Sequence, residues 1–300
     1  MEESITAARV ANAILQDHSF SGHYVLVEGR KDVKLYRRFL DDESVRIRLT
    51  AGKSKLKDAF EILSKNNYQK KIGIRDADFL RIHNNPKFNP DYADSIFATD
   101  YHDAEIMMML SGALSDYFAI ISEFEKVEQF EKVQGETVVN LIFSLLYRLG
   151  CLRLANKRFN LKLAFKPKNI GGNKLKIDKF IDEKTWKYLG DNQMVHIVSE
   201  YSKNRGEQIS SKQSIIDHLN EIIAEDHPAH EIIHGHDVSE VLLMVSKSGL
   251  KSSSKLLQDA SCVEDILTAC FDLKKFSTTR LHADIEKWQE QNKVKIFKET

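Results

Sequence analysis

The chain has 300 residues, of which 42% are hydrophobic, and its 44 Lys and Arg residues are balanced by 44 Asp and Glu. This composition excludes a disordered or fibrous protein, and the length suggests about two domains. Three scattered cysteines fit neither a disulfide framework nor a usual zinc site, which favours a reducing, cytoplasmic setting. We expect no export signal and no membrane span, because the start is acidic and polar residues interrupt the longest apolar run.

The first 120 residues alternate between short β-rich runs and helical patterns. After a leading helix at residues 5–15, we expect strands at 24–27, 45–49, 71–74 and 96–98. Helices are expected at 32–40, at 54–65 and from near His102, and a Pro- and Asn-rich loop at 83–90 precedes the last strand. Strands separated by helices predict an α/β fold with a mainly parallel sheet flanked by helices.

Beyond residue 118 the patterns become mostly helical. Helices are expected at 138–149, 182–189, 193–201, 211–224, 238–246, 262–273 and 278–289. The sequence therefore predicts three parts, namely an N-terminal helix (1–20), an α/β domain (21–118) and a mostly helical C-terminal region (119–300).

Acidic residues follow three of the four expected strands, where the crevice of a parallel sheet lies. They are Glu28 after the first strand, Asp76 and Asp78 after the third, and Asp100, Asp103 and Glu105 after the fourth. In an extended chain Asp76 and Asp78 would point the same way and share a ligand. Carboxylates gathered in this way raise one another's pKa unless a cation is present, and such oxygen ligands select Mg²⁺ or Mn²⁺. Single acidic residues such as Asp32 and Asp103 also suit helix caps.

Three stretches carry a resemblance to a known family. Tyr-Val-Leu-Val-Glu-Gly-Arg (24–30) and Gly-Ile-Arg-Asp-Ala-Asp-Phe (73–79) resemble the Toprim signature, a Glu after the first strand and Asp-x-Asp after the third. Thr-Asp-Tyr-His-Asp-Ala-Glu (99–105) looks like the Toprim-like family that was long labelled a domain of unknown function. That family includes AriB, the effector subunit of the PARIS anti-phage system. The resemblance covers about residues 23–112.

The resemblance implies a metal-dependent phosphodiesterase whose catalytic domain is residues 21–118. Effectors of this kind are toxic endoribonucleases that cut host tRNA in abortive infection, act as dimers, and are restrained by a partner ATPase of the AAA or ABC-like type. Glu28 would be the general base or a metal ligand, and Asp76 and Asp78 would hold Mg²⁺. Asp100, Asp103 or Glu105 would complete a second metal position.

Two other functions stay open at this point. One is a DNA nuclease like the Toprim part of overcoming-lysogenization-defect proteins, and the other is a non-catalytic regulatory partner with a Toprim fold. The chain lacks a complete Walker A motif, because Ile47 stands where its first glycine would be, so ATP hydrolysis would belong to a partner.

Several basic residues are candidates for substrate contact. Lys53 lies between the second strand and a helix, so its ammonium and the helix N-terminus would both face a phosphate, and Arg30 and Lys31 adjoin Glu28. Residues 148–177 carry nine basic side chains and no acid, interrupted by Phe159 and Phe165. This pattern predicts RNA contact through Arg153, Lys157 and Arg158. The alternative for all of these is a solvated surface.

Four histidines crowd residues 227–236, but their spacing disfavours zinc. We expect a short strand at 231–234, a turn at Gly235, and a helix capped by Asp237 with Glu240. If that strand joins the sheet, His236 would approach the metal site as an acid or phosphate contact.

Overall fold

The structure is a computed structural model of the chain, and it describes residues 5–82, 95–167, 172–203 and 208–298. The expected loop at 83–90 lies outside these residues. The chain divides into two compact units, Met1–Gly112 with Phe271–Thr300, and Ala113–Cys270.

The first unit contains a four-stranded parallel sheet. Its strands are β1 (His23–Val27), β2 (Val45–Leu49), β3 (Lys71–Arg75) and β4 (Ile96–Ala98), in the order β2-β1-β3-β4. Val27 of β1 pairs with Leu49 and with Ile74, so three strands reach the carboxyl edge at one level. The expected α/β fold with a parallel sheet is confirmed, and each expected strand lies within one residue of the observed bounds.

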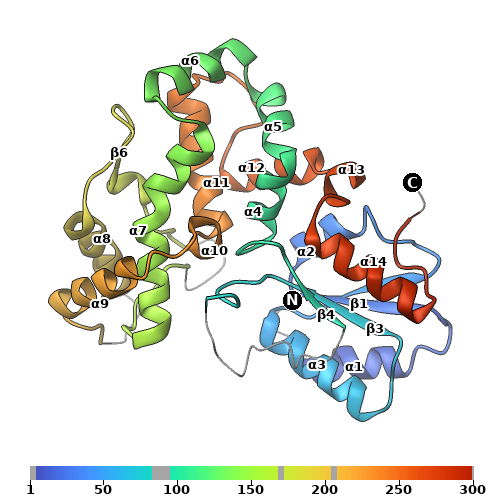
Figure 1. Cartoon of the computed structure of the whole chain (residues 1–300). Helices are drawn as coiled ribbons and strands as arrows, with labels where there is room; N and C mark the ends of the chain where they lie inside the picture. The colour runs from blue at the N-terminus through green and yellow to red at the C-terminus, as the bar shows by residue number, and fades with distance from the viewer. Residues whose placement is uncertain (1–4, 83–94, 168–171, 204–207, 299–300) are drawn as a thin grey trace. The chain divides into compact units, whose positions relative to one another are not determined.

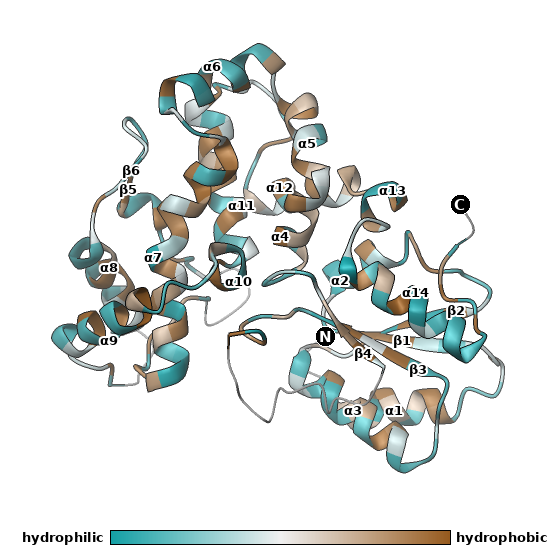
Figure 2. Ribbon diagram, in the orientation of Figure 1, coloured by the Kyte–Doolittle hydropathy of each residue, from teal (hydrophilic) through white to brown (hydrophobic). Residues whose placement is uncertain are grey.

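Helices cover both faces of this sheet (Figure 1). α1 (Ala7–Leu15) and α3 (Lys53–Lys65) lie on one face, and α2 (Arg30–Tyr36) and α14 (Arg280–Asn292) lie on the other. Leu56, Ala59, Phe60 and Leu63 of α3 are buried, as their helical spacing predicts. Figure 2 shows the strands mainly hydrophobic and the helices two-sided, which is how a helix-covered parallel sheet forms its core.

The last 30 residues return to the first unit. Asp41 donates its backbone N–H to the carbonyl of Ile296, and Lys298 donates to the carbonyl of Phe39, each at 2.9 Å. Phe39 also stacks on Phe276, which ends α13 (Leu273–Phe276), with ring centroids 4.5 Å apart. The units therefore differ from the expected domains, because the sequence placed all of 119–300 in one helical region.

The junction after the sheet is a broken helix. α4 (Ala104–Met108) continues into a π-helical turn at Met109–Ala113, where Gly112 has a φ of 99°. That left-handed conformation suits glycine and interrupts the long helix expected from His102 onward. The helical path resumes as α5 (Leu114–Ile121) in the second unit.

The second unit is built around one long helix, α7 (Val138–Phe159). Helices α9 (Lys212–Ala224), α10 (Ala229–Ile232) and α11 (Gly235–Met244) pack against it. The unit also contains α6 (Phe124–Gln134), α8 (Asp191–Lys203) and α12 (Ala260–Cys270), with a 3₁₀ turn at Ile177–Lys179 and a π-helical turn at Val245–Gly249.

The prediction of a helix at 182–189 is wrong. A small hairpin of β5 (Ile181–Asp182) and β6 (Lys187–Tyr188) stands there instead. Asp182 accepts hydrogen bonds from the Lys184 N–H and the Thr185 hydroxyl, and Trp186 has a φ of 53°. An aspartate that bonds the following backbone favours a turn over a helix.

Within the described residues, two segments are long and apolar enough to cross a membrane, Ala104–Ile121 and α7. Their apolar windows are 50% and 67% buried inside the protein, respectively. Burial of this kind is typical of the core helices of a soluble protein, so length and composition here are weak evidence for a membrane span.

Candidate metal centre

The carboxyl edge of the sheet gathers acidic side chains from neighbouring strands. Glu28 follows β1 directly, and Asp76 and Asp78 follow β3, its hydrogen-bonded neighbour. The loop after β2 is tied to the same edge, because Gly52 donates its N–H to the Glu28 carbonyl at 3.0 Å. The sequence-predicted set of Glu28 and the Asp pair therefore comes from adjacent positions of one edge.

Glu28 is the most informative side chain of this edge. Its Oε1 atom is buried and has no hydrogen-bond partner among the described residues. Burial, followed by the negative charge of Asp78, raises its pKa to about 7. A buried carboxylate without a donor is costly when ionised, and a cation would remove that cost. The orphaned oxygen therefore fits a divalent metal ligand.

Asp32 adds a carboxyl group that the sequence suggested only as a helix cap. Its Oδ2 accepts the Gly29 N–H at 2.7 Å, so the capping role is confirmed. Burial nevertheless raises the pKa of Asp32 to about 6, and the negative charge of Glu105 acts in the same direction. The spacing in the sequence could have indicated Asp32 as a further site residue, because Asp32 lies one helical turn after Glu28.

Contrary to expectation, the side chains of Asp76 and Asp78 do not point the same way. β3 ends at Arg75, and Asp78 has a φ of 48°, so the chain is not extended there. Asp76 Oδ1 accepts the Ala104 N–H at 3.1 Å, whereas Asp78 Oδ2 pairs with Lys53 Nζ at 2.6 Å. The prediction from strand alternation is therefore wrong for this pair.

These different surroundings shift the pKa values of the two aspartates in opposite directions. Burial, followed by the negative charge of Asp103, raises the pKa of Asp76 well above its usual value. Burial acts in the same direction on Asp78, but the charge and hydrogen bond of Lys53 outweigh it and lower the pKa of Asp78. Among the described residues, Asp78 thus has a cationic partner in Lys53, whereas the largest influences on Asp76 are burial and negative charges.

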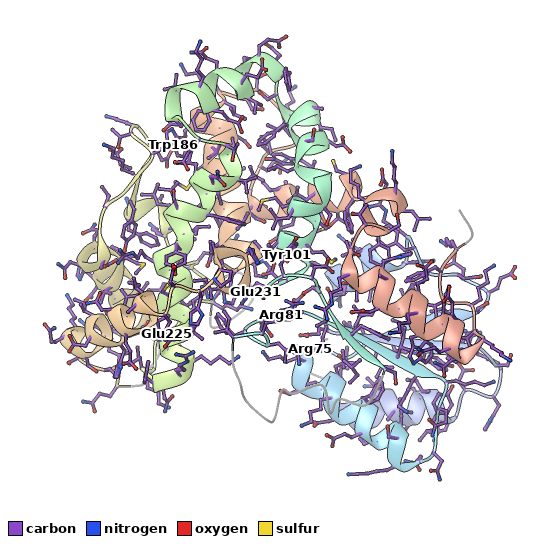
Figure 3. All side chains as sticks on the ribbon, viewed as in Figure 1. Arg75, Arg81, Tyr101, Trp186, Glu225 and Glu231 are labelled. Atoms are coloured by element: carbon purple, nitrogen blue, oxygen red, sulfur yellow. The ribbon has the colours of Figure 1, made fainter. Side chains whose placement is uncertain are left out.

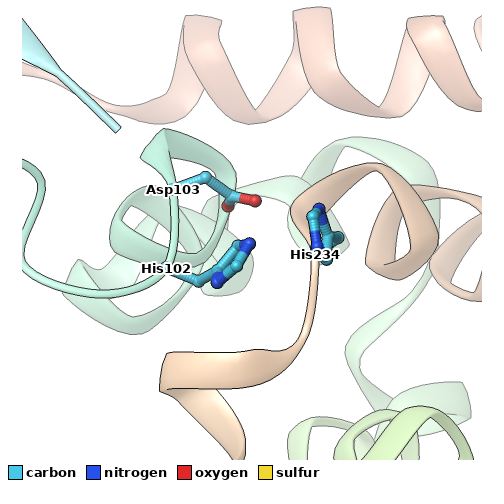
Figure 4. Close-up of side chains that lie close together, drawn as sticks. All are labelled: His102, Asp103 and His234. Carbon is cyan, nitrogen blue, oxygen red and sulfur yellow. The ribbon is translucent and has the colours of Figure 1, made fainter. Parts of the chain in front are cut away.

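The acidic residues after β4 have separate structural roles. Asp103 caps α4 by accepting the Ile106 N–H at 3.1 Å, and Figure 4 shows its side chain beside His102. Glu105 lies 3.8 Å from Lys31 Nζ. Asp103 and Glu105 both add negative charge near Asp76. They remain candidates for completing a metal site.

Asp100 is a correction to the predicted ligand set. Its two carboxylate oxygens accept the backbone N–H groups of Arg280 and Leu281, each at 2.8 Å. These are the first two residues of α14. The side chain of Asp100 therefore caps the start of a helix. The sequence does not indicate this role, because 180 residues separate Asp100 from Arg280.

Basic groups lie among the acidic ones. Lys53 is the first residue of α3, which begins one residue earlier than expected, and it pairs with Asp78. Arg75, which the sequence analysis did not single out, is 6% exposed and lies 3.8 Å from Asp78 Oδ2; Figure 3 labels it. Arg30 and Lys31 begin α2, and the Lys31 side chain is half exposed.

Ion pairs neutralise part of the basic run of the second unit. Arg153 forms a bidentate pair with Asp237, at 2.9 and 2.7 Å, and the two side chains are 9% and 8% exposed. Arg153 also lies over the ring of Phe165, while Phe159 stacks on His218. Arg153 is therefore a core residue, and its predicted substrate contact is wrong.

The remaining members of that predicted set lie nearer the surface. Arg158 pairs with Glu225, and Lys157 is exposed. These two positions stay candidates for RNA contact. Lys168, within the same run, lies outside the described residues.

The histidine segment differs from its prediction. Residues 229–232 form α10, so no strand at 231–234 joins the sheet as the structure describes it. α11 already begins at Gly235, and Asp237 pairs with Arg153 and does not cap the helix. His236 Nδ1 lies 2.6 Å from Glu264 Oε1. The strand that was expected to place His236 is absent from the described residues, and His236 stays a candidate for substrate contact.

No protein-family model matches the chain, and no curated protein matches it. Function is therefore inferred from the residues and from the geometry of the first unit. That unit offers buried carboxyl groups with raised pKa values, Glu28, Asp32 and Asp76, at the carboxyl edge of a parallel sheet. Carboxylate oxygens are the ligands that hard divalent cations prefer, and these residue types by themselves leave the substrate open.

Proposed function

We propose that this protein is a Mg²⁺-dependent nuclease with a Toprim-type catalytic unit. The observation that carries the proposal is the buried Oε1 of Glu28, which has no hydrogen-bond partner among the described residues. It lies where a parallel sheet presents its functional edge, with Asp32 and Asp76 contributing to the same electrostatic environment. Strongly perturbed carboxyl groups gathered at such an edge are typical of functional sites.

Glu28, Asp32 and Asp76 would hold the cation, with Asp103 or Glu105 from the start of α4 completing the set; Mn²⁺ suits the same oxygens. A bound cation would neutralise charge on the phosphoryl group and on the attacking and leaving oxygens. Glu28 would serve as a ligand or as the general base, and both roles need its ionised form. A pKa of about 7 leaves that form accessible at neutral pH.

For the substrate we propose RNA, with host tRNA as the target of a toxic anti-phage effector. The support is the resemblance of residues 24–30, 73–79 and 99–105 to the Toprim-like family described above. The same resemblance leads us to propose an active homodimer in the cytoplasm and a restraining ATPase partner of the AAA or ABC-like type. Cleavage of DNA, or no cleavage, would favour the two alternatives.

The test is cleavage of purified total tRNA and of plasmid DNA by the full chain, prepared without an ATPase partner. Each substrate is incubated with Mg²⁺ and with EDTA, and Glu28→Ala is the inactive comparison. We expect discrete tRNA fragments only with Mg²⁺ and only with Glu28 present. Sequencing the fragment ends then identifies the tRNA and the position of the cut.

Each other result has a defined meaning. Cleavage of plasmid DNA alone would replace the RNase proposal with a DNA nuclease. Fragments that persist in EDTA would contradict the metal requirement. If a well-folded protein cuts neither substrate, as judged by circular dichroism, the non-catalytic function takes precedence.

A further inference from the structure

Helix α2 and the turn that follows it carry a group of exposed basic side chains shortly after Glu28. The helical turns continue as far as Leu40, because Arg37 and Leu40 donate their N–H groups to carbonyls four residues earlier, each at 3.1 Å. The exposed basic residues of this segment are Arg30, Lys31, Lys34, Arg37 and Arg38, which we call the basic face.

The spacing places these residues on one side of the helix. They stand at positions i, i+1, i+4, i+7 and i+8, whereas Leu35 and Tyr36 are buried on the opposite side. The one acid of the helix, Asp32, is partly buried and accepts the Gly29 N–H at 2.7 Å. The solvent-facing side of α2 itself therefore carries positive charge without an acid.

Two acids that follow this segment have basic partners elsewhere. Asp41 pairs with Lys295 at 3.2 Å. Asp42 pairs with Lys298 at 3.1 Å. Both lysines belong to the C-terminal segment of the same unit, so these two acids are matched by bases outside the basic face.

Helix stability does not explain the arrangement. Like charges three or four residues apart are neighbours on a helix surface and destabilise the helix, and Lys34 has such neighbours on both sides. Arg30 and Lys31 also stand in the first turn, where the helix dipole disfavours positive charge. Departures of this kind from the rules of helix stability are expected at functional surfaces.

We propose that the basic face binds the phosphate backbone of the RNA substrate. Lys and Arg side chains neutralise phosphates, and this releases counterions from the nucleic acid. The face begins two residues after Glu28, so a backbone bound along α2 reaches the edge of the sheet that carries the candidate site. The inference rests on the proposed function for its choice of RNA, and it adds a binding surface that acts before any bond is cut.

The experiment measures binding separately from cleavage. Fluorescently labelled tRNA is titrated with the full chain in EDTA, and fluorescence anisotropy gives the dissociation constant from about 50 to about 300 mM KCl. The test variant is the double substitution Lys34→Gln with Arg37→Gln. Arg38 is left in place because its guanidinium donates to the Phe271 carbonyl at 3.0 Å.

A matched control removes the same two kinds of charge from the other side of the sheet. It is the double substitution Arg9→Gln with Lys65→Gln, which changes one exposed residue of α1 and one of α3. These helices lie on the opposite face of the sheet from α2 (Figure 1). Circular dichroism checks that both variants fold, and the single variant Arg37→Gln replaces the double one if that one does not.

We expect the test variant to bind tRNA at least about tenfold more weakly than the wild type at about 0.1 M KCl. The slope of log Kd against log salt concentration should fall by about one for each phosphate contact that is lost, so by about two for the double variant. The control variant should bind as the wild type does.

The other outcomes separate this inference from the proposed function. Equal binding by the folded test and control variants would overturn the inference and leave the proposed nuclease intact. Wild-type binding to polyglutamate as tight as to tRNA would also overturn it, in favour of an acidic protein partner. Weaker binding by the test variant, together with no cleavage of tRNA by the wild type in Mg²⁺, would support the binding surface and remove the proposed nuclease.

Discussion

Asp100 accepts the backbone N–H of Leu281 at 2.8 Å, across 181 positions of the sequence. Its other oxygen accepts the neighbouring N–H of Arg280. One side chain thus joins the turn after β4 to the N-terminus of α14, where a negative charge also meets the positive end of the helix dipole. The C-terminal segment is therefore part of the unit that carries the candidate metal centre.

Asp100→Ala should lower the free energy of unfolding by about 1–2 kcal/mol, because two helix N–H groups lose their acceptor. Asp100→Asn keeps one acceptor oxygen and should cost less. Urea denaturation of the full chain measures both. Asp284→Ala, which removes an exposed acid further along α14, is the control and should change stability by less than about 0.5 kcal/mol. Equal stability of all three variants would contradict the capping role.

In the metal-free chain, Glu28→Gln should raise the free energy of unfolding more at pH 8 than at pH 5. The folded-state pKa of Glu28 is raised, so its contribution to stability is present below the ordinary value of 4.5 and is lost as the pH rises through about 7. The difference between the two pKa values corresponds to about 3 kcal/mol at most.

The measurement is the difference in unfolding free energy between wild type and Glu28→Gln, taken at both pH values in EDTA. Glu61→Gln, an exposed position on α3, controls for loss of a surface charge and should change little at either pH. A Glu28→Gln difference that stays constant from pH 5 to pH 8 would contradict a buried, unpaired carboxyl group.

Binding of Mg²⁺ should become tighter between pH 6 and pH 8. Burial raises the pKa of Glu28 to about 7 and that of Asp32 to about 6, so both groups must release protons to bind a cation. For each proton displaced, the affinity should change by up to about tenfold per pH unit. Calorimetry in two buffers of different ionisation enthalpy counts the protons. Binding without proton release at pH 6 would refute this coupling.

Arg153→Met should destabilise the protein by about 3–5 kcal/mol, because it leaves the buried carboxylate of Asp237 without its partner. The matched comparison is Arg158→Met, whose pair with Glu225 is partly solvent-exposed and should be worth less than about 1 kcal/mol. Guanidinium denaturation distinguishes the two. If Arg153→Met is as stable as the wild type, Arg153 is not the core residue described here.

The fold of the first unit was predictable because its signals are local. Each strand is a short β-rich run, and each helix shows apolar residues at helical spacing, so patterns such as Leu56 to Leu63 determine both element and buried face. The acidic edge was predictable for the same reason, since carboxyl ends of parallel strands meet at one edge. Glu28 and Asp76 follow from that rule alone.

Several of the errors come from partners that are distant in the sequence. Asp100 looks like a ligand until α14 is placed against it, and Arg153 looks like a surface cation until Asp237 is known to face it. Asp237 looks like a helix cap for the same reason. The sequence also assigned the final 30 residues to the helical region, because nothing local indicates that Phe276 packs on Phe39.

The central claim is that the edge formed by Glu28, Asp32 and Asp76 is a divalent metal centre. The most direct measurement is an anomalous difference map from crystals of the full chain grown with Mn²⁺, collected at the manganese absorption edge. Our account predicts one peak within coordination distance of these three carboxylates, about 2.0–2.3 Å from their oxygens. A map with no peak at this edge, from crystals that contain Mn²⁺ at a concentration supporting activity, would contradict it.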